Sequence, residues 1–581
     1  MNQDSFIQRL WHRRIPQILG AYVMAGVAVV GFVGLLVERY KLADRVFDAA
    51  LLAFFTMIPA ILLLAYTHGA PGKQAWGRLE RFGIPINVAI TLVLVVGVLL
   101  TETRVEALTE TVEVVNVDGS IEEKLRPRAE KRRELAMFFW RNDSGDESLE
   151  WLRYGFPILL RRDLEQNPFF DTNSAFSFTT ELERADIADA LDVPIALAQR
   201  ISRDHGITYF TDGSFAREGD DWRANLVLYL TETAEPVVTL DATGPTYVEV
   251  VDELSIAVRK ALDVVDIEEL GRDLPVTEHT SVEAIAIEQW IRGNVAQWRD
   301  NQAQTAIDSF QKAIEIDPTF ALAYSDLAAT YSSLGKNTEA IEAASSARKH
   351  DYRLNERERL ILPIFELVAT GHYKKLILVH EQITTLFPTD VSAWRGLAHT
   401  YELFGEPVQA IEAYQHVLEL DPSEHEVQLE IGRLQSQLGN YEEARQAYQH
   451  YVEARPDDAS GHMALATTSW FEGDLEETRA TFEQARLLTS NPINVDILLA
   501  ELDGAQGNLE AAERRLNDLS IRVTVPMDRL TVENARIQHY SYLGRYQKGL
   551  ALSAELHEVL LAVGLPFVAD LSVLNYEAST L

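Results

Sequence analysis

The 581-residue sequence contains no cysteine, which excludes disulfides, thiolate metal ligands and cysteine nucleophiles. It also lacks the phosphate-binding GxxxxGKS/T loop, the HExxH zinc motif, the GxSxG hydrolase turn and a GxGxxG fingerprint after a strand. Its fourteen histidines are scattered, without the helical spacing of metal ligands. We therefore expect no catalytic residues, no metal and no cofactor, and a protein that is not an enzyme. A catalytic site of unrecognised type is the lesser alternative.

Basic residues are scarce, with 52 lysines and arginines against 88 acidic residues and a net charge of −36. Residues 1–101 hold nine of the basic and five of the acidic residues, so the negative charge falls on the rest of the chain. Nucleic-acid binding is not expected, because contacts with phosphates need a basic patch. The acidity is typical of a solvated surface that resists aggregation, and an acidic face for a basic partner is the alternative.

Long uncharged runs occupy residues 15–37, 49–72 and 82–101. A helix of about 20 apolar residues crosses a hydrocarbon core about 30 Å thick. We predict a membrane anchor at residues 1–101 with transmembrane helices at about 17–37, 48–67 and 83–101. The first run is too long for a cleaved signal peptide, and two more runs follow it closely.

Basic residues beside these runs favour one orientation. Six of them precede the first run or lie between the second and third: Arg9, Arg13, Arg14, Lys73, Arg78 and Arg81. Four lie on the opposite side: Arg39, Lys41, Arg45 and Arg104. Because cytoplasmic loops carry the excess of lysine and arginine, we expect a cytoplasmic N-terminus and place residues after about 102 outside the cytoplasm.

The composition changes after residue 101, where we expect a linker at 102–133 and a small α/β domain at 134–270. The apolar run 135–140 predicts a buried strand. Alternation in 207–215 and 222–231, around a turn at 218–221, predicts a β-hairpin. Helical spacing marks three further segments, at 151–167, 187–203 and 248–262.

Three segments of this region resemble the TolB-like N-terminal domain: FFWRNDSGDESLEWLRYGF, HGITYFTDGSFAREGDDWRANLVLYL and TYVEVVDELSIAVRKAL. In bacterial membrane proteins, that domain often precedes tetratricopeptide repeats outside the cytoplasm. The resemblance implies a bacterial inner-membrane protein whose α/β domain and C-terminal region lie in the periplasm. It also implies a signalling or assembly protein without catalytic output of its own.

A 34-residue pattern recurs after residue 281. In residues 391–422 it places large, small and helix-ending residues at Trp394, Leu397, Ala398, Tyr401, Gly405, Ala410, Tyr414 and Pro422. This spacing resembles the tetratricopeptide repeat, a helix–turn–helix unit. Glycines recur at the same phase, at Gly335, Gly371, Gly405, Gly439, Gly473, Gly507 and Gly544. We predict a solenoid of about eight repeats at 281–562 and a C-terminal tail at 563–581.

In this family the first helix of each repeat lines the concave face of a superhelix. The phase of the pattern assigns seven candidate partner-binding residues to that face: Arg395, His399, Glu402, Arg433, Gln437, Met463 and Trp470. Arginine and tryptophan are frequent anchors of protein interfaces. Packing against the next repeat is the alternative role for Trp470.

Together these patterns predict a multi-domain protein with three transmembrane α-helices, a small α/β (TolB-like) domain and an all-α tetratricopeptide solenoid. We expect a membrane-anchored scaffold or accessory subunit that binds another cell-envelope protein on the periplasmic side, within a larger membrane complex. The alternative is an envelope signal receptor, whose TolB-like domain senses a ligand and relays it through the membrane helices to a separate cytoplasmic effector.

Overall fold

A computed structural model of the chain describes residues 14–40, 45–68, 76–100, 104–264, 270 and 273–562. The tail expected at 563–581 lies outside these residues, and so do residues 41–44 and 69–75 of the loops between the expected spans. The chain divides into two compact units, residues 1–110 and 111–581. Each unit is described by itself.

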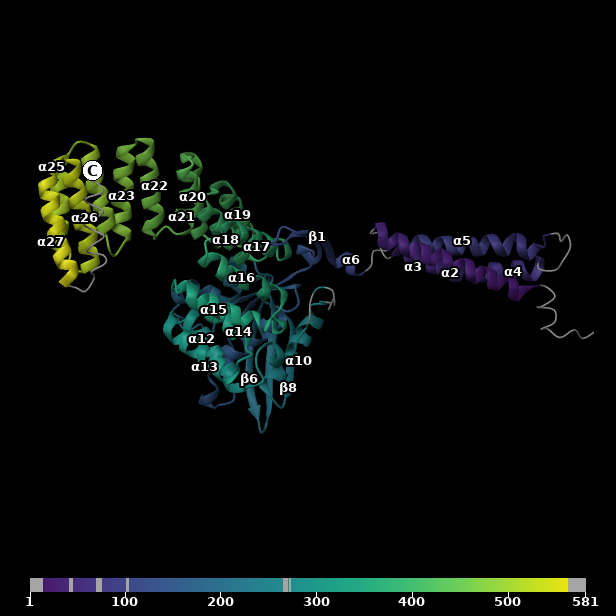
Figure 1. The fold of residues 1–581 in the computed structure, drawn as a ribbon. Helices are drawn as coiled ribbons and strands as arrows, with labels where there is room; N and C mark the ends of the chain where they lie inside the picture. Colours follow the sequence, from purple (N-terminus) through teal and green to yellow (C-terminus); the bar gives the residue numbers. More distant parts are fainter. Residues whose placement is uncertain are drawn as a thin grey trace, which may run out of the picture. The chain divides into compact units, whose positions relative to one another are not determined.

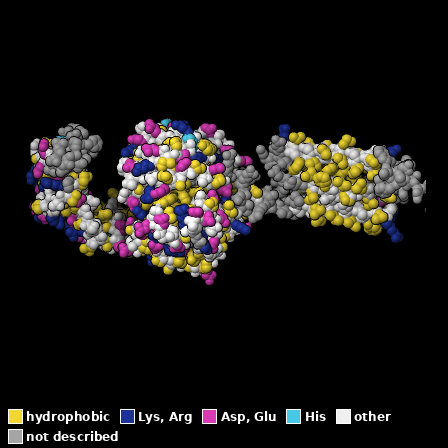
Figure 2. Space-filling model, turned by 90° about the horizontal axis from the view of Figure 1, so that it is seen from below, with side chains coloured by type: hydrophobic (Ala, Val, Ile, Leu, Met, Phe, Trp, Pro, Cys, Tyr) yellow, Lys and Arg dark blue, Asp and Glu magenta, His cyan; other side chains and the backbone are white. Residues whose placement is uncertain are grey.

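The first unit is helical and apolar. Its helices are α2 (Ile15–Tyr40), α3 (Arg45–Thr56), α4 (Ile58–His68), α5 (Arg78–Leu100) and the short α6 (Arg104–Leu108). Among the described residues, Ile15–Leu36, Ala49–His68 and Arg78–Gly97 are long and apolar enough to cross a membrane. Figure 1 shows α2 to α5 side by side, and Figure 2 shows hydrophobic side chains over the outside of this unit. Such a surface is typical of helices that face lipid.

A break between α3 and α4 interrupts the second of these stretches. Pro59 lies one residue inside α4 and has no N–H for the helical ladder. Close to this point, the carbonyl of Thr56 accepts a hydrogen bond from Asn87 Nδ2 on α5, at 3.1 Å. The Tyr22 hydroxyl on α2 donates to the Phe54 carbonyl at 2.6 Å. These side chains satisfy backbone groups near the break, as an apolar environment requires.

The second unit contains a small sheet domain. Its strands are β3 (Arg133–Met137), β4 (Arg141–Asn142), β5 (Phe170–Ser174), β6 (Tyr209–Glu218), β7 (Asp221–Leu230) and β8 (Pro236–Gly244), in the order β5-β3-β6-β7-β8 with β4 beside β6. β3 is parallel to β5 and β6, whereas β6, β7 and β8 form an antiparallel meander. The expected hairpin is present as β6 and β7.

Helices α7 (Leu152–Leu164) and α10 (Tyr247–Ala261) pack on one face of the sheet, and α9 (Ile195–Asp204) packs against β6. Aromatic rings fill the core, where Phe156 stacks on Trp140 at 5.1 Å and on Phe215 at 5.0 Å between ring centroids. Gly213 permits this arrangement, because a Cβ at that position would lie 2.4 Å from the Trp140 ring. Stacked pairs of this kind add to the stability that apolar burial provides.

The helix expected at 187–203 is shorter in the structure. α9 begins only at Ile195, after Pro194 at its N-cap. Upstream, Asp186, Ala190 and Asp192 have positive φ angles between 54° and 61°, which a continuous right-handed helix does not allow. The apolar spacing that predicted a longer helix arises from loop residues such as Ala190, which is buried under the domain.

Residues 102–133, expected as a linker, contain a two-stranded sheet of β1 (Thr109–Val115) and β2 (Ile121–Pro127). Val114 is buried among apolar residues of α16 (Glu356–Ala369) and α17 (Tyr373–Leu386). Lys124 on β2 forms an ion pair with Glu356 at 2.6 Å. Alternation of the valines in 112–117 thus reflects a strand whose inner face covers two helices.

Residues 284–562 fold into a solenoid of consecutive helix pairs, shown in green to yellow in Figure 1. The first helices of the pairs are α12 (Ala284–Trp298), α14 (Ala321–Ser333), α16, α18 (Val391–Phe404), α20 (Glu426–Gln437), α22 (Ala459–Glu472), α24 (Ile493–Ala505) and α26 (Pro526–Tyr542). The second helices are α13 (Ala303–Ile316), α15 (Asn337–Arg348), α17, α19 (Pro407–Leu420), α21 (Tyr441–Ala454), α23 (Leu475–Leu488), α25 (Leu509–Arg522) and α27 (Tyr546–Ala562).

The recurring glycines lie at the turns inside the pairs. All seven have φ angles between 67° and 87°, a left-handed conformation that glycine adopts without steric cost. In the first pair, Asn301 takes the same role with a φ of 50°. The turn prediction made from these glycines is therefore confirmed.

Candidate functional site

The seven residues predicted to bind a partner lie on the first helices of three successive pairs, α18, α20 and α22. Glu402 and Arg433 come together, because the Arg433 guanidinium donates to Glu402 of the preceding pair and, at 2.7 Å, to Glu430. Arg395 forms an ion pair with Glu424, in the loop between α19 and α20. Both arginines keep more than a third of their side chains exposed.

The remaining predicted residues divide into exposed and packed ones. His399 and Gln437 are exposed. Met463 and Trp470 lie against the buried cluster of α22 to α24, where the Trp470 ring meets Phe482 edge-on at 6.3 Å. The exposed aromatic residue of this helix is the next one, Phe471, which stacks on Tyr441 at 5.9 Å.

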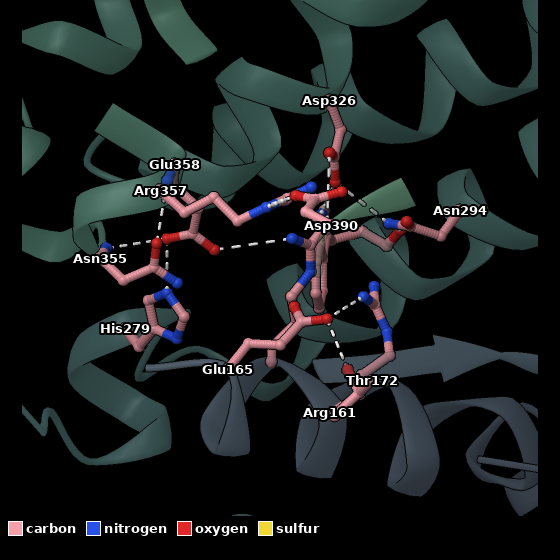
Figure 3. A network of polar contacts seen from close by, with 12 residues as sticks. Arg161, Glu165, Thr172, His279, Asn294, Asp326, Asn355, Arg357, Glu358 and Asp390 are labelled. Atoms are coloured by element: carbon pink, nitrogen blue, oxygen red, sulfur yellow. Dashed lines mark hydrogen bonds and ion pairs between the residues drawn. The ribbon is translucent and has the colours of Figure 1, made fainter. Parts of the chain in front are cut away.

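A polar network that the sequence did not predict joins the sheet domain to the repeats (Figure 3). Arg162 on α7 reaches Asp326 on α14 at 3.6 Å and Glu358 on α16 at 3.5 Å. Its neighbour Arg161 donates to Glu165 at 2.6 Å. Since these residues come from segments far apart in the chain, no local motif could reveal the network.

Glu358 is the most enclosed carboxylate of this network. It accepts hydrogen bonds from His279 Nε2 at 2.9 Å and from the Asn355 backbone at 2.9 Å, while Asn355 caps α16 in return. Burial alone would favour the neutral acid, but the attraction of His279 and Arg162 outweighs it and lowers the pKa of Glu358 to about 2. The side chain is therefore a carboxylate at neutral pH.

A second pair closes the network near the start of α18. Arg357 Nε donates to Asp390 at 2.6 Å, and Asp390 also caps α18 by accepting from the Ala393 backbone at 3.0 Å. The opposing charge of Asp390 raises the pKa of Arg357. Arg132, from the segment before β3, donates to Thr389 at 2.5 Å.

A cavity of about 420 Å³ lies between the sheet domain and the repeats. Its lining includes charged residues of both signs: Arg132, Arg161, Arg162, Arg357, Glu134, Glu165, Asp171, Asp326, Asp390, Asp421 and His205. His205 bonds Asp421 at 2.7 Å. The volume falls in the range of ligand-binding sites. Because enclosed charges need partners of opposite charge or hydrogen bonds, a ligand of this cavity would have to complement them.

Asp171 is the cavity carboxylate whose charge is least supported. The surrounding protein raises the pKa of Asp171 to about 6, because burial penalises its charged form more than the nearby Arg132 stabilises it. Among the described residues, no group of three or more histidine, aspartate and glutamate side chains is placed to hold a metal ion. The arrangement is therefore one of charge pairs and hydrogen bonds.

Comparison with known proteins identifies the repeats. The sequence matches the tetratricopeptide repeat family over residues 309–342 and 403–467. It is 28% identical over 144 residues to Superkiller protein 3 of Schizosaccharomyces pombe, which is 24% of this chain and 10% of that protein. The chain thus spans about a tenth of that relative's length.

Solved structures of repeat proteins overlap with parts of the fold. A tetratricopeptide repeat protein from Parabacteroides merdae is 16% identical with a TM-score of 0.34, covering 44% of this chain and all of that one. Pseudomonas aeruginosa pilF is 21% identical with a TM-score of 0.31, covering 37% of this chain and 97% of its own. The two family matches are the stronger finding. Residues 309–342 and 403–467 contain tetratricopeptide repeats, whose family generally mediates protein–protein interactions and is generally not catalytic.

Proposed function

We propose that this tetratricopeptide repeat protein is a membrane-anchored scaffold or accessory subunit, which binds another cell-envelope protein on the periplasmic side of a bacterial inner membrane. The observation that carries the proposal is the combination, in one chain, of three helices suited to a bilayer with family-matched repeats. A scaffold needs both a tether and an extended protein-binding surface.

We place the partner on the first helices α18, α20 and α22, at Arg395, His399, Glu402, Arg433, Gln437, Met463 and Trp470. Arg395 and Arg433 support this choice, since each is partly exposed and already oriented by a carboxylate. Arginines held in this way can bind a second carboxylate with little loss of side-chain freedom. Met463 and Trp470 would contribute the apolar floor beside them.

The test is purification of the full chain from gently solubilised membranes, followed by mass spectrometry of co-purifying proteins. The double variant Arg395→Ala/Arg433→Ala is expected to lose most of the partner at unchanged helicity by circular dichroism. Arg348→Ala is the matched control, because Arg348 is similarly exposed and ion-paired but lies on a second helix. Equal partner yield from the double variant and the control would reject the proposed surface.

Sidedness has its own test. Alkaline phosphatase fused after Leu581 is active only outside the cytoplasm, and we expect activity. An inactive fusion that is present at normal levels would contradict the periplasmic placement.

The receptor function is the second candidate, and the cavity beside the sheet domain favours it. In that case the TolB-like domain would sense a ligand and the membrane helices would relay it to a separate cytoplasmic effector. Co-purification of a cytoplasmic protein that depends on residues 69–75, between the second and third spans, would distinguish the receptor from the scaffold.

A further inference from the structure

The strand β5 forms one edge of the sheet and lines the cavity along its whole length. β5 pairs with β3, and within the described part of the chain no strand pairs with its other edge. All five residues from Phe170 to Ser174 contribute to the cavity lining. Residues of both faces of β5 therefore border the same space, as expected when the open edge of a strand faces it.

The ladder between β3 and β5 shows which backbone groups of β5 remain open. The Arg133 N–H donates to the Phe169 carbonyl at 2.7 Å, and Arg133 is the register partner of Phe170. In a parallel ladder, the residues of one strand turn their backbone groups alternately to the two sides. Asp171 and Asn173 therefore bond β3, whereas Thr172 and Ser174 turn their N–H and C=O groups toward the free edge. An open edge of this kind is a template for another strand.

Carboxylates are in excess around this edge, since the cavity lining holds six carboxylates against four arginines and His205. Glu134 on β3 is the register partner of Asp171 on β5, so two carboxylates lie side by side on one face of the sheet, an unfavourable pairing. Glu134 accepts a hydrogen bond from the Thr208 hydroxyl at 3.0 Å. Arg132 and the Thr389 side chain stabilise the charge of Asp171 only in part.

Other charges of the lining are already paired. Glu165 has Arg161 at 2.6 Å, and Asp390 has Arg357 at 2.6 Å. Arg161, Arg162 and Arg357 are thus ion-paired inside the enclosed cavity, which disfavours a free anion as the ligand. A cation placed between Glu134 and Asp171 would instead relieve their repulsion.

We propose that a short extended segment of a partner polypeptide, carrying a lysine or arginine, adds as a strand to the free edge of β5 and places its cationic side chain at Glu134 and Asp171. Backbone hydrogen bonds to Thr172 hold the segment, and the carboxylate pair selects its charge. Three residues of strand extend about 10 Å, which suits a cavity of about 420 Å³. This site is separate from the surface on α18 to α22 and does not depend on it.

The experiment titrates the full-length protein in detergent against a fluorescein-labelled peptide, acetyl-Val-Lys-Val-Lys-Val-amide, and follows fluorescence anisotropy. Saturable binding is expected, and an acidic peptide with glutamates in place of the lysines is expected to bind at least about tenfold more weakly. Equal affinity for the two peptides, or no saturable binding of the basic one, would overturn the proposal.

Two substitutions at Thr172 distinguish the contribution of its backbone N–H to peptide binding from that of its side chain. Thr172→Pro removes the outward N–H together with the hydroxyl, and edge strands tolerate proline. We expect it to weaken peptide binding by about tenfold or more. Thr172→Val keeps that N–H and removes only the hydroxyl, which bonds Glu165 at 2.6 Å, so binding should persist. Unchanged affinity in a folded Thr172→Pro protein would reject strand addition.

Two further measurements do not depend on the proline variant. A basic peptide N-methylated at its central valine loses a backbone donor and is expected to bind wild-type protein more weakly. The variant Glu134→Gln/Asp171→Asn is expected to lose its preference for the basic over the acidic peptide. Retention of that preference would contradict the assigned cation position.

Discussion

His279 Nε2 lies 2.9 Å from Glu358 Oε2, and both side chains are buried. His279 ends α11 (Val276–His279), just after the sheet domain, whereas Glu358 lies in the first turn of α16, in the third helix pair. The contact therefore joins the start of the repeat region to a point two pairs further along. With Arg162 beside them, these residues connect the sheet domain firmly to the repeats.

Glu358→Gln should destabilise the second unit by about 3–5 kcal/mol, because it leaves His279 buried without its carboxylate and takes away one of the two carboxylates beside Arg162. Urea unfolding followed by circular dichroism measures the loss. Glu366→Gln, on the exposed side of the same helix, removes an ion pair at 3.8 Å and should change stability by less than about 1 kcal/mol. Equal losses in the two variants would contradict a larger contribution of the buried His279–Glu358 pair to stability.

The same carboxylate predicts a dependence on acid. Its pKa is lowered from 4.5 to about 2 in the folded protein, so its stabilising effect is complete above pH 4.5 and disappears as the pH falls toward 2. The stability difference between wild type and Glu358→Gln should therefore shrink over that interval. A difference that stays constant with pH would contradict the assigned ionisation.

Asp171 predicts the opposite dependence. Its pKa is raised from 3.8 to about 6 on folding, so its contribution to stability is fully present below pH 3.8 and is lost as the pH rises through 6. The stability of Asp171→Asn relative to wild type should therefore increase by about 1 kcal/mol when the pH is raised from 5 to 8. Chemical denaturation of both proteins at the two pH values tests this, and a gain that is equal at both would refute it.

Two glycines test the close packing inside the repeats. A Cβ on Gly432 in α20 would lie 2.4 Å from the Tyr448 ring of α21, whereas a Cβ on Gly504 in α24 would meet no atom within 4 Å. Gly432→Ala should destabilise by about 1–3 kcal/mol through overpacking. Gly504→Ala should stabilise by about 0.5–1 kcal/mol, since alanine favours helix. Thermal unfolding of both variants should shift in opposite directions.

Adjacent valines on β1 test the docking of the hairpin. Val114 is 1% exposed against α16 and α17, whereas Val115 is 41% exposed. Val114→Ala should cost about 1–3 kcal/mol from lost burial and a cavity, and Val115→Ala should cost less than about 0.5 kcal/mol. Limited proteolysis at Asp118 to Ser120 provides the local readout. Faster cleavage is expected only for Val114→Ala.

Local patterns in the chain were sufficient for the helices of the repeats, their turns and the apolar stretches. Seven glycines spaced by the repeat marked left-handed turns, because that backbone conformation strongly favours glycine. The apolar runs predicted three helices able to cross a bilayer, because lipid demands length and uniform hydrophobicity along one segment. Small residues facing large ones, as Gly432 faces Tyr448, also follow from the repeat spacing.

The polar sites required the folded chain. His279 and Glu358 are 79 residues apart, and Glu134 meets Asp171 only because β5 joins the edge of the sheet beside β3. Trp470 had the phase of a partner-binding residue, yet its ring packs on Phe482 of the next helix. Charge pairs and buried contacts of this kind depend on how distant segments pack, and helical or strand periodicity carries no information about that packing.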